Sequence, residues 1–321
     1  MRWHFLVSIS ASLLAAPQPA HSESYPTQTI TIVLPFSAGT GIDIATRVFA
    51  EKLSQRFGQP VVLENRPGAG GNLGHGAVAK ASPDGYTFLM AANTLAMNTS
   101  LYNLPFDPVT SFAPVGLYVK GGMVLIVHQR VKANTVNELI ALAKENPGKL
   151  NYATPGIGTP QHLAMELLRR TTGADIVHIP HKGAAEAVRE VVRGEIETMF
   201  APIQSVLPHI NEGNVRALAV SGTRRHVALP QTPTVAEATG NPDFDVDLWY
   251  GLFAPAGTPQ AIVDKLNGEI GAIVELPDVQ ERLQKLGMSR NPSSAKELGD
   301  LYRSDAARWA KLIKDAGIKP Q

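Results

Sequence analysis

The 321-residue chain contains no cysteine, and this absence removes several classes of protein at once. Disulfide scaffolds, thiol catalysis, zinc sites built on cysteine and lipid attachment at an N-terminal cysteine all need that side chain. Net charge is also nearly absent, because 29 lysines and arginines oppose 28 aspartates and glutamates for a formal charge of +1. Proteins that bind nucleic acid through phosphates usually carry a basic excess, so we expect no nucleic-acid partner.

Long apolar runs are scarce as well. Beyond the N-terminal region, no stretch reaches the about 18 uninterrupted apolar residues that a transmembrane helix needs. The apolar run at residues 5–16 is too short to span a bilayer, follows Arg2 and precedes prolines and small residues. This order predicts a cleaved signal peptide over residues 1–22, cut after Ser22, with a cut after Ala20 as the weaker option. We therefore expect an exported, soluble mature protein; an uncleaved anchor is the alternative.

The remaining composition, 44% hydrophobic and 18% charged, is that of an ordinary folded protein. Short apolar runs alternate with stretches of helical spacing, which predicts an α/β fold of parallel sheets with helices on both faces. A polar, proline-containing connection at residues 222–242 interrupts this pattern. Capping-box patterns at Thr135–Glu138 and Ser294–Glu297 mark two helix starts. The expected strands are residues 30–34, 61–64, 86–92, 115–119, 123–128, 150–153, 176–179, 198–201, 215–220 and 246–253.

Two segments of the chain combine a strand, a turn of small residues and a helix. In the first, the apolar strand 30–34 ends at Pro35, and the small residues that follow lead into a helix from about Ile42. The same order returns at residues 154–162, where a glycine-bearing turn precedes a helix with Thr159 as its expected N-cap. We name residues 35–43 the first cradle and residues 154–162 the second cradle.

A turn of this kind predicts an anion site. It presents unpaired N–H groups and the positive end of a helix dipole, which suit an anion without any cationic side chain. If the two series of strands form two lobes whose facing edges carry the cradles, both turns would hold one small carboxylate. Such a site binds a ligand and supplies neither a nucleophile nor a base. A plain strand–helix turn without a ligand is the alternative.

Other motifs are incomplete. The glycine-rich segment after the second strand has Gly68 and Gly70 but Leu73 where a dinucleotide fingerprint needs glycine, and no phosphate-binding P-loop occurs. The common hydrolase motifs HExxH, GxSxG and SxxK are missing. His178 and His181 lie three apart on an expected strand and point to opposite faces, which argues against a shared metal. We therefore expect no cofactor and no metal.

With these residues in view, the chain resembles the substrate-binding proteins of tripartite tricarboxylate transporters, the Bug-type family of periplasmic proteins. The resemblance extends from Tyr25 to the C-terminus. The segments that carry it are YPTQTITIVLPFSAGTGID, ENRPGAGGNLG, NPGKLNYATPGIGTPQHLA, LPHINEGNVRALAVSGTRR and WYGLFAPAGTP. Their combination in this order is very specific.

The resemblance implies a two-lobed periplasmic binding protein fold of type II, each lobe a mainly parallel sheet flanked by helices, with the ligand between the lobes. It places residues 23–121 and 243–321 in lobe 1 and residues 122–242 in lobe 2. It also implies a periplasmic, monomeric receptor that is not an enzyme. Such a receptor captures a di- or tricarboxylate, an acidic amino acid or an aromatic acid and delivers it to a membrane permease.

The resemblance further implies that main-chain N–H groups and ordered waters hold the ligand. Two departures from the family pattern touch this site, because the first turn has Ser-Ala-Gly-Thr where Pro-Pro-Gly-Gly is usual, and Ala201 stands where Asp, Asn or Gly is common. A third departure is His181, where Tyr is common. The implied ligand-binding residues are Phe36, Ser37, Ala38, Gly39, Thr40, Asp43, Thr94, Thr154, Gly156, Gly158, Thr159, His162 and Ala201.

Several alternatives stay open at this point. Asp43 is expected either to interact with the dipole of its helix or to meet an ammonium group or water near the ligand. His162 is either a structural histidine or a donor in the pocket. The partner could be a membrane histidine kinase that senses the loaded receptor. A secreted enzyme that uses His162 as a base is a further alternative.

Overall fold

The structure, a computed structural model, describes residues 25–320; the expected signal peptide and its cleavage site lie outside these residues. The first part of the chain forms β1 (Ile30–Leu34), α1 (Gly41–Phe57), β2 (Val61–Asn65), the short 3-10 helix η1 (Ala69–Gly71), α2 (Asn72–Ala79), β3 (Thr87–Ala92), α3 (Thr94–Leu101) and β4 (Phe112–Gly121). None of the helices within residues 25–320 is long and apolar enough to cross a membrane.

The middle of the chain forms β5 (Met123–His128), α4 (Val136–Glu145), β6 (Leu150–Thr154), α5 (Pro160–Thr172), β7 (Ile176–Pro180), α6 (Ala184–Arg193), β8 (Thr198–Pro202), α7 (Ile203–Asn211), β9 (Val215–Val220) and α8 (Val235–Thr239). The last part forms β10 (Leu248–Pro255), α9 (Gln260–Val274), α10 (Pro277–Lys285), β11 (Met288–Arg290) and α11 (Ala295–Asp315). Every strand expected from the sequence is present.

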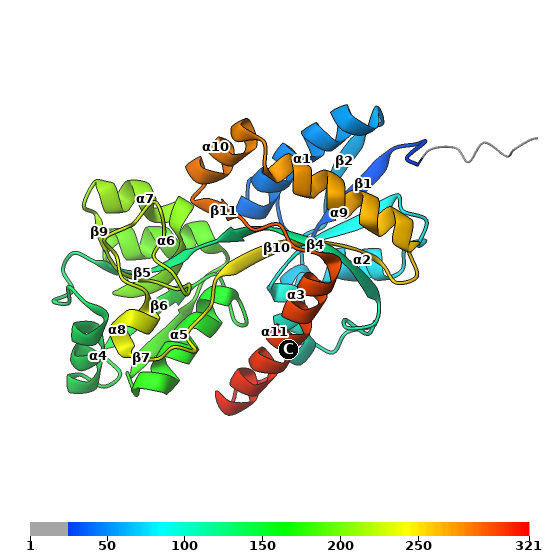
Figure 1. The fold of residues 1–321 in the computed structure, drawn as a ribbon. Coiled ribbons are helices and arrows are strands. Elements are labelled where there is room, and N and C mark those ends of the chain that lie inside the picture. The colour runs from blue at the N-terminus through cyan, green and yellow to red at the C-terminus, as the bar shows by residue number, and fades with distance from the viewer. Residues whose placement is uncertain (1–24, 321) are drawn as a thin grey trace, which may run out of the picture.

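The strands make two sheets, each with helices packed on it (Figure 1). One sheet has the order β11-β4-β10-β3-β1-β2, and the other has the order β7-β6-β8-β5-β9. The first and last parts of the chain share the first sheet, whereas the middle part supplies the whole of the second (Figure 1). Two bodies, each around one sheet, therefore lie side by side.

The expectation of mainly parallel sheets needs a correction, because both sheets are mixed. β1 pairs in parallel with β2 and β3, but β10 runs antiparallel to β3 and β4. In the second sheet β6 is parallel to β7 and β8, but β5 is antiparallel to β8 and β9. β11 is also antiparallel to β4. Two of the antiparallel strands, β5 and β10, are those by which the chain enters each sheet from the other one.

The two segments that join the bodies lie against each other. Only Gly122 separates β4 from β5, and an added Cβ there would lie 2.7 Å from Ile203 Cδ1. On the return path, Ser221 donates its N–H to the Met123 carbonyl at 2.9 Å and accepts from the Val246 N–H at 3.0 Å. Ser221 therefore ties the outgoing segment to the returning one.

Local sequence signals explain most element boundaries. Ser294 and Glu297 form the expected capping box of α11. At α4 the Thr135 hydroxyl caps the helix, but Glu138 accepts from the N–H of Asn134 instead of Thr135, so that box is only half formed. Two elements, β11 and α8, were not predicted from the sequence, although the start of α8 carries a complete capping box.

Apolar side chains bury the sheets as the sequence predicts. All residues of β1 except Thr31 are buried, as expected for a strand covered on both faces. Trp249, Tyr250 and Phe253 on β10 are buried core residues. The edges from which the cradles project are therefore anchored in rigid sheets.

Candidate functional site

The first cradle is a tight turn between β1 and α1. Gly39 has φ +82°, a left-handed conformation that favours glycine. Its N–H donates to Oδ2 of Asp43 at 2.9 Å, and the Thr40 hydroxyl donates to the Ser37 carbonyl at 2.9 Å. The side chain four residues after the glycine therefore closes the turn.

The second cradle, between β6 and α5, repeats this bonding at the matching positions. Gly158 has φ +75°, and its N–H donates to Nδ1 of His162 at 3.1 Å. The Thr159 hydroxyl donates to the Gly156 carbonyl at 2.8 Å and also caps α5. Two segments far apart in the sequence thus form the same turn.

This bonding changes what the cradles can offer a ligand. The sequence predicts free N–H groups in both turns, but the N–H groups of Gly39 and Gly158 are already bonded within the chain. The N–H of Gly156 likewise donates to the Thr154 hydroxyl, at 3.2 Å. The first turn of each helix remains as the source of donors, since those N–H groups have no intrahelical acceptor.

Asp43 is a buried carboxylate with several donors. Oδ2 accepts from Gly39 and from Nε of Arg47 at 3.0 Å, while Oδ1 accepts from Arg47 at 3.0 Å and from Asn65 at 3.1 Å. Burial alone would raise the pKa of Asp43, but the bonds from Arg47, Gly39 and Asn65 outweigh it and lower the pKa below its ordinary value. Asp43 is therefore charged and paired, and its first role is to fix the turn.

His162 closes the second cradle as a neutral ring. It is buried and stacks on His178 with ring centroids 4.2 Å apart, and His178 stacks in turn on Tyr152 at 4.9 Å. Burial lowers the pKa of His162, and burial together with the neighbouring His162 lowers the pKa of His178 to about 4. These contacts favour the structural interpretation of His162 over that of a pocket donor.

Each cradle faces an element of the other body. A Cβ on Gly158 would lie 2.4 Å from Cδ1 of Leu101, at the end of α3. A Cβ on Gly41, the first residue of α1, would lie 2.8 Å from Nε2 of Gln204 on α7. His226 also bonds the Gly287 carbonyl at 2.9 Å across the two bodies. The two bodies therefore contact each other next to each cradle.

The remaining expected site residues have different surroundings. Ser37, Ala38, Gly39 and Thr40 are exposed, and Phe36 is half-buried. Thr94 begins α3, and its buried hydroxyl has no hydrogen-bond partner in the described part of the chain. Ala201 is fully buried in β8 and packs in the core of the second sheet, so its side chain does not reach the cradles' surface. Gln204 was missed, because no local signal in the sequence brings α7 to α1.

His178 and His181 do not form a metal site with a third ligand. Among residues 25–320, no group of three His, Cys, Asp or Glu side chains is arranged to hold an ion. His178 instead shares a 2.6 Å hydrogen bond with the Thr154 hydroxyl, and the His181 N–H donates to the Thr154 carbonyl at 2.9 Å. Both histidines therefore support the second cradle.

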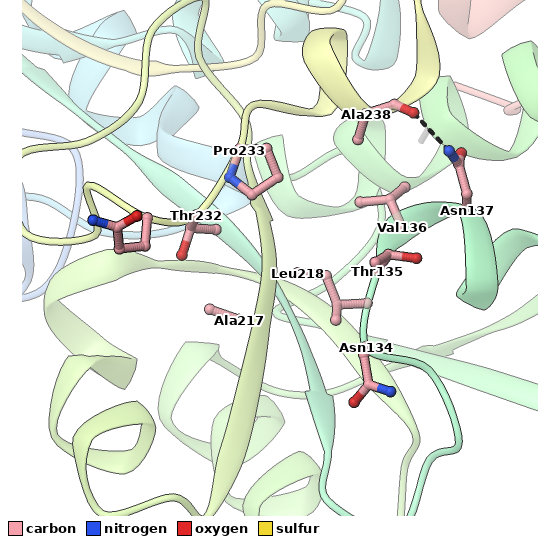
Figure 2. Close-up of a pocket in the computed structure, with 10 residues that line it drawn as sticks. Asn134, Thr135, Val136, Asn137, Ala217, Leu218, Thr232, Pro233 and Ala238 are labelled. Atoms are coloured by element: carbon pink, nitrogen blue, oxygen red, sulfur yellow. Dashed lines mark hydrogen bonds between the residues drawn. The ribbon is translucent and has the colours of Figure 1, made fainter.

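A pocket of about 420 Å³ lies away from both cradles, between the start of α4 and the segment that leads into α8 (Figure 2). Its lining is neutral, and Asn137 bonds the Ala238 carbonyl across it at 2.9 Å. The free donors at the start of α4 are partly used, since Thr135 caps Glu138. The pocket has the first turn of one helix alone, whereas the cradles offer the first turns of two helices, one on each body, so the cradles remain the candidate site.

Comparison with known proteins identifies the family of the chain. A family model described as the tripartite tricarboxylate transporter family receptor matches residues 45–318. A protein of Pseudomonas sp. strain P51, described as a UPF0065 protein in the tcbD-tcbE intergenic region, is 39% identical over 91% of this chain and 87% of its own length.

Solved structures agree in fold. R. palustris Rpa4515 with adipate has a TM-score of 0.83 at 32% identity, covering 92% of this chain and 100% of that one. The periplasmic binding protein BugD has a TM-score of 0.80 at 35% identity, with coverage of 92% and 100%. MatC from Rhodopseudomonas palustris with bound malate has a TM-score of 0.79 at 31% identity, with coverage of 90% and 100%.

These matches confirm the two-lobed fold expected from the sequence. They also remove the enzyme alternative, because the matched family consists of receptors. The chain belongs to the tripartite tricarboxylate transporter receptor family, the Bug-type solute-binding proteins.

Proposed function

We propose that this protein is a periplasmic receptor that captures one small carboxylate between its lobes and delivers it to a membrane permease of the tripartite tricarboxylate type. The observation that carries this proposal is the pair of matching cradles, one on each sheet, with the opposite body against each of them. The signal peptide that the sequence predicts over residues 1–22 and the description of BugD as a periplasmic binding protein support the proposed location.

The proposed lobes are residues 23–121 with 243–321, and residues 122–242. They would close as rigid bodies about Gly122 and the segment around Ser221, which are the two places where the chain passes between the sheets. A ligand stabilises the closed state only through contacts that are better in that state. A carboxylate that bonds to both cradles at once has such contacts.

The proposed donors are N–H groups in the first turns of α1 and α5, together with the exposed edge of the first cradle. Gly41 and Ile42 begin α1 and Gln161 follows the N1 proline of α5, so their N–H groups lack an acceptor four residues back. The helix dipoles add favourable potential for an anion at both places. Bound adipate and malate in two structures of this family support a short dicarboxylate as the ligand class.

A thermal-shift screen of the mature protein against short carboxylates tests the proposal. A ligand at a hundredfold excess over its Kd raises the free energy of unfolding by about 2.7 kcal/mol. We expect a clear rise in Tm for a subset of the acids. The same acids should give no shift with Gly158→Ala, whose Cβ would strike Leu101. Gly240→Ala is the matched control, because Gly240 also has positive φ but has open space around it. Equal shifts in all three proteins would contradict the placement of the site.

A further inference from the structure

His226 lies on the segment between β9 and α8, and its ring is held in one orientation. The Ala228 N–H donates to Nδ1 at 3.2 Å, so the proton of the neutral ring is on Nε2. Burial lowers the pKa of His226, which favours this neutral form. The N–H of Leu229 donates to the His226 carbonyl at 2.9 Å, and Leu229 packs in the core of the second sheet. The ring is therefore fixed to the second body and presents one N–H donor.

The acceptor of that donor belongs to the first body. Nε2 of His226 donates to the Gly287 carbonyl at 2.9 Å. Gly287 stands between α10 and β11, and β11 pairs with the end of β4, with Met288 opposite Gly121. In Figure 1, β11 lies on the side of the first body that faces the second. The short strand β11 thus holds the carbonyl of Gly287 beside the point where the chain leaves the first sheet.

The hydrogen bond lies next to the crossing between the bodies. A Cβ on Gly122 would lie 2.7 Å from Cδ1 of Ile203 and 3.0 Å from Cδ2 of His226. A Cβ on Gly287 would lie 3.4 Å from the backbone nitrogen of Gln204. Rotation about Gly122 moves His226 relative to Gly287, because the two residues are on different bodies. Since a hydrogen bond needs a donor–acceptor distance near 3 Å, it can exist only over a narrow range of rotation.

The two bodies are close together in this structure. A Cβ on Gly158 would lie 2.4 Å from Leu101 of the first body, and a Cβ on Gly41 would lie 2.8 Å from Nε2 of Gln204 of the second. Opening about the crossings has to separate these surfaces, so the bodies stand at a closed angle. The bond from His226 is made at that angle. A contact that is better in the closed state stabilises that state, whether or not a ligand is present.

We propose that the bond from His226 to the Gly287 carbonyl is a latch, made when the lobes close and broken when they open, and that it prolongs the time for which a carboxylate is held. His226 acts on the ligand through the angle between the lobes, which makes it a positioning residue. The effect on a carboxylate rests on the proposed function, whereas the angle itself can be measured without any ligand.

Pulsed electron paramagnetic resonance of the ligand-free protein tests the latch. Because the chain has no cysteine, Lys80→Cys and Lys149→Cys place one spin label on an exposed position of each body. His226→Asn keeps an acceptor for the Ala228 N–H, but its shorter amide does not reach Gly287. We expect the ratio of closed to open molecules to fall about fivefold in this variant, as for the loss of one hydrogen bond. His226→Gln should restore the ratio, because its Nε2 is as many bonds from Cβ as that of histidine.

The matched control is Arg225→Ala. Arg225 precedes His226, and its Nε donates to Glu237 at 3.0 Å within the second body, so its loss should leave the distance distribution unchanged. Identical distributions in wild type and His226→Asn would overturn the latch. An equal shift in Arg225→Ala would also overturn it, and so would a failure of His226→Gln to restore the ratio, because each would show that the bond to Gly287 is not the cause.

Stopped-flow kinetics with malate and with adipate measure the effect on a ligand. A latch made after capture should leave the association rate nearly unchanged and speed dissociation about fivefold in His226→Asn. A direct ligand contact or a general loss of structure would not give this split together with rescue by His226→Gln. Unchanged dissociation would overturn the holding role. If neither acid binds, the proposed ligand class is wrong, and the ligand-free distances still decide whether the latch exists.

Discussion

The two cradles have the same backbone turn but close it with different chemistry. In the first, Gly39 bonds the charged Asp43, which Arg47 and Asn65 hold in place. In the second, Gly158 bonds the neutral ring of His162, which is held by stacking on His178. A turn of this type therefore needs an acceptor four residues after its glycine, and either a carboxylate or an imidazole can supply it.

The surroundings of the turns differ as much as their acceptors. Gly39 is exposed, and a Cβ there would meet nothing within 4 Å. Gly158 is buried against Leu101 of the other body. The first cradle thus depends mainly on its own bonds, whereas the second also depends on how closely the lobes approach.

The largest expected difference between the cradles comes from a single methyl group. Gly158→Ala should weaken carboxylate binding by about a hundredfold or more, because the new Cβ has a strained φ and would lie 2.4 Å from Leu101. Gly39→Ala creates no such clash and should weaken carboxylate binding only through the strain of its positive φ, which is on the order of 1–2 kcal/mol. Titration calorimetry of both variants measures the ratio. Leu101→Ala in the Gly158→Ala background should recover part of the loss. Equal losses in the two single variants would show that lobe contact is irrelevant to the second cradle.

Removal of the acceptor of the first cradle should have a smaller effect, mainly on stability. Asp43→Ala leaves the Gly39 N–H without its acceptor and removes one of the two acceptors of the Asn65 amide, which keeps the Phe36 carbonyl, at a cost of about 1–3 kcal/mol in the free energy of unfolding. Asp43→Asn keeps one acceptor oxygen and should cost less. Urea denaturation checks both. Asp300→Ala is the control, because its partners Lys296 and Arg303 are exposed and such pairs contribute little. A cost as small as that of the control would mean that Asp43 does not fix the turn.

The third prediction concerns pH, and its expected effect is the smallest. A fall from pH 7 to pH 4 should weaken the contribution of the second cradle to stability before that of the first. The pKa of His178 is lowered from 6.5 to about 4, so its contribution to stability is complete above pH 6.5 and is lost as the pH falls towards 4. The lowered pKa of Asp43 means that its contribution is lost only below the ordinary aspartate range, near pH 4.

The measurement is the free energy of unfolding between pH 7 and pH 4 for wild type and His178→Gln. Wild type should lose on the order of 1 kcal/mol relative to the variant in this interval, with allowance made for the partial exposure of His178. The comparison with the variant cancels other titrating groups, among them Asp247, whose pKa burial raises to about 7. Parallel curves for the two proteins would contradict a neutral His178 in the folded protein.

Much of the fold follows from short stretches of sequence. The strands have apolar runs, the helices at Thr159 and Ser294 have caps, and each signal lies within a few residues of its effect. The same holds for the general form of the cradles. The strand directions were harder to predict from the sequence. β5 and β10 are antiparallel to their neighbours, and these are the strands by which the chain passes from one sheet to the other. The helix α8 was missed although its capping box, Thr234 with Glu237, stands in the sequence.

The sequence by itself determined the turns, the helix starts and the family, since these depend on residue types at fixed local spacing. Tertiary structure alone decided which acceptor each turn uses, which surface faces each glycine and which oxygens stay unpaired. Asn93 and Asp247 are 154 residues apart, yet they share a hydrogen bond. Leu101 and Gly158 meet only because two separate sheets bring α3 and the second cradle together. Such contacts depend on packing across the whole molecule, and a local pattern carries no trace of them.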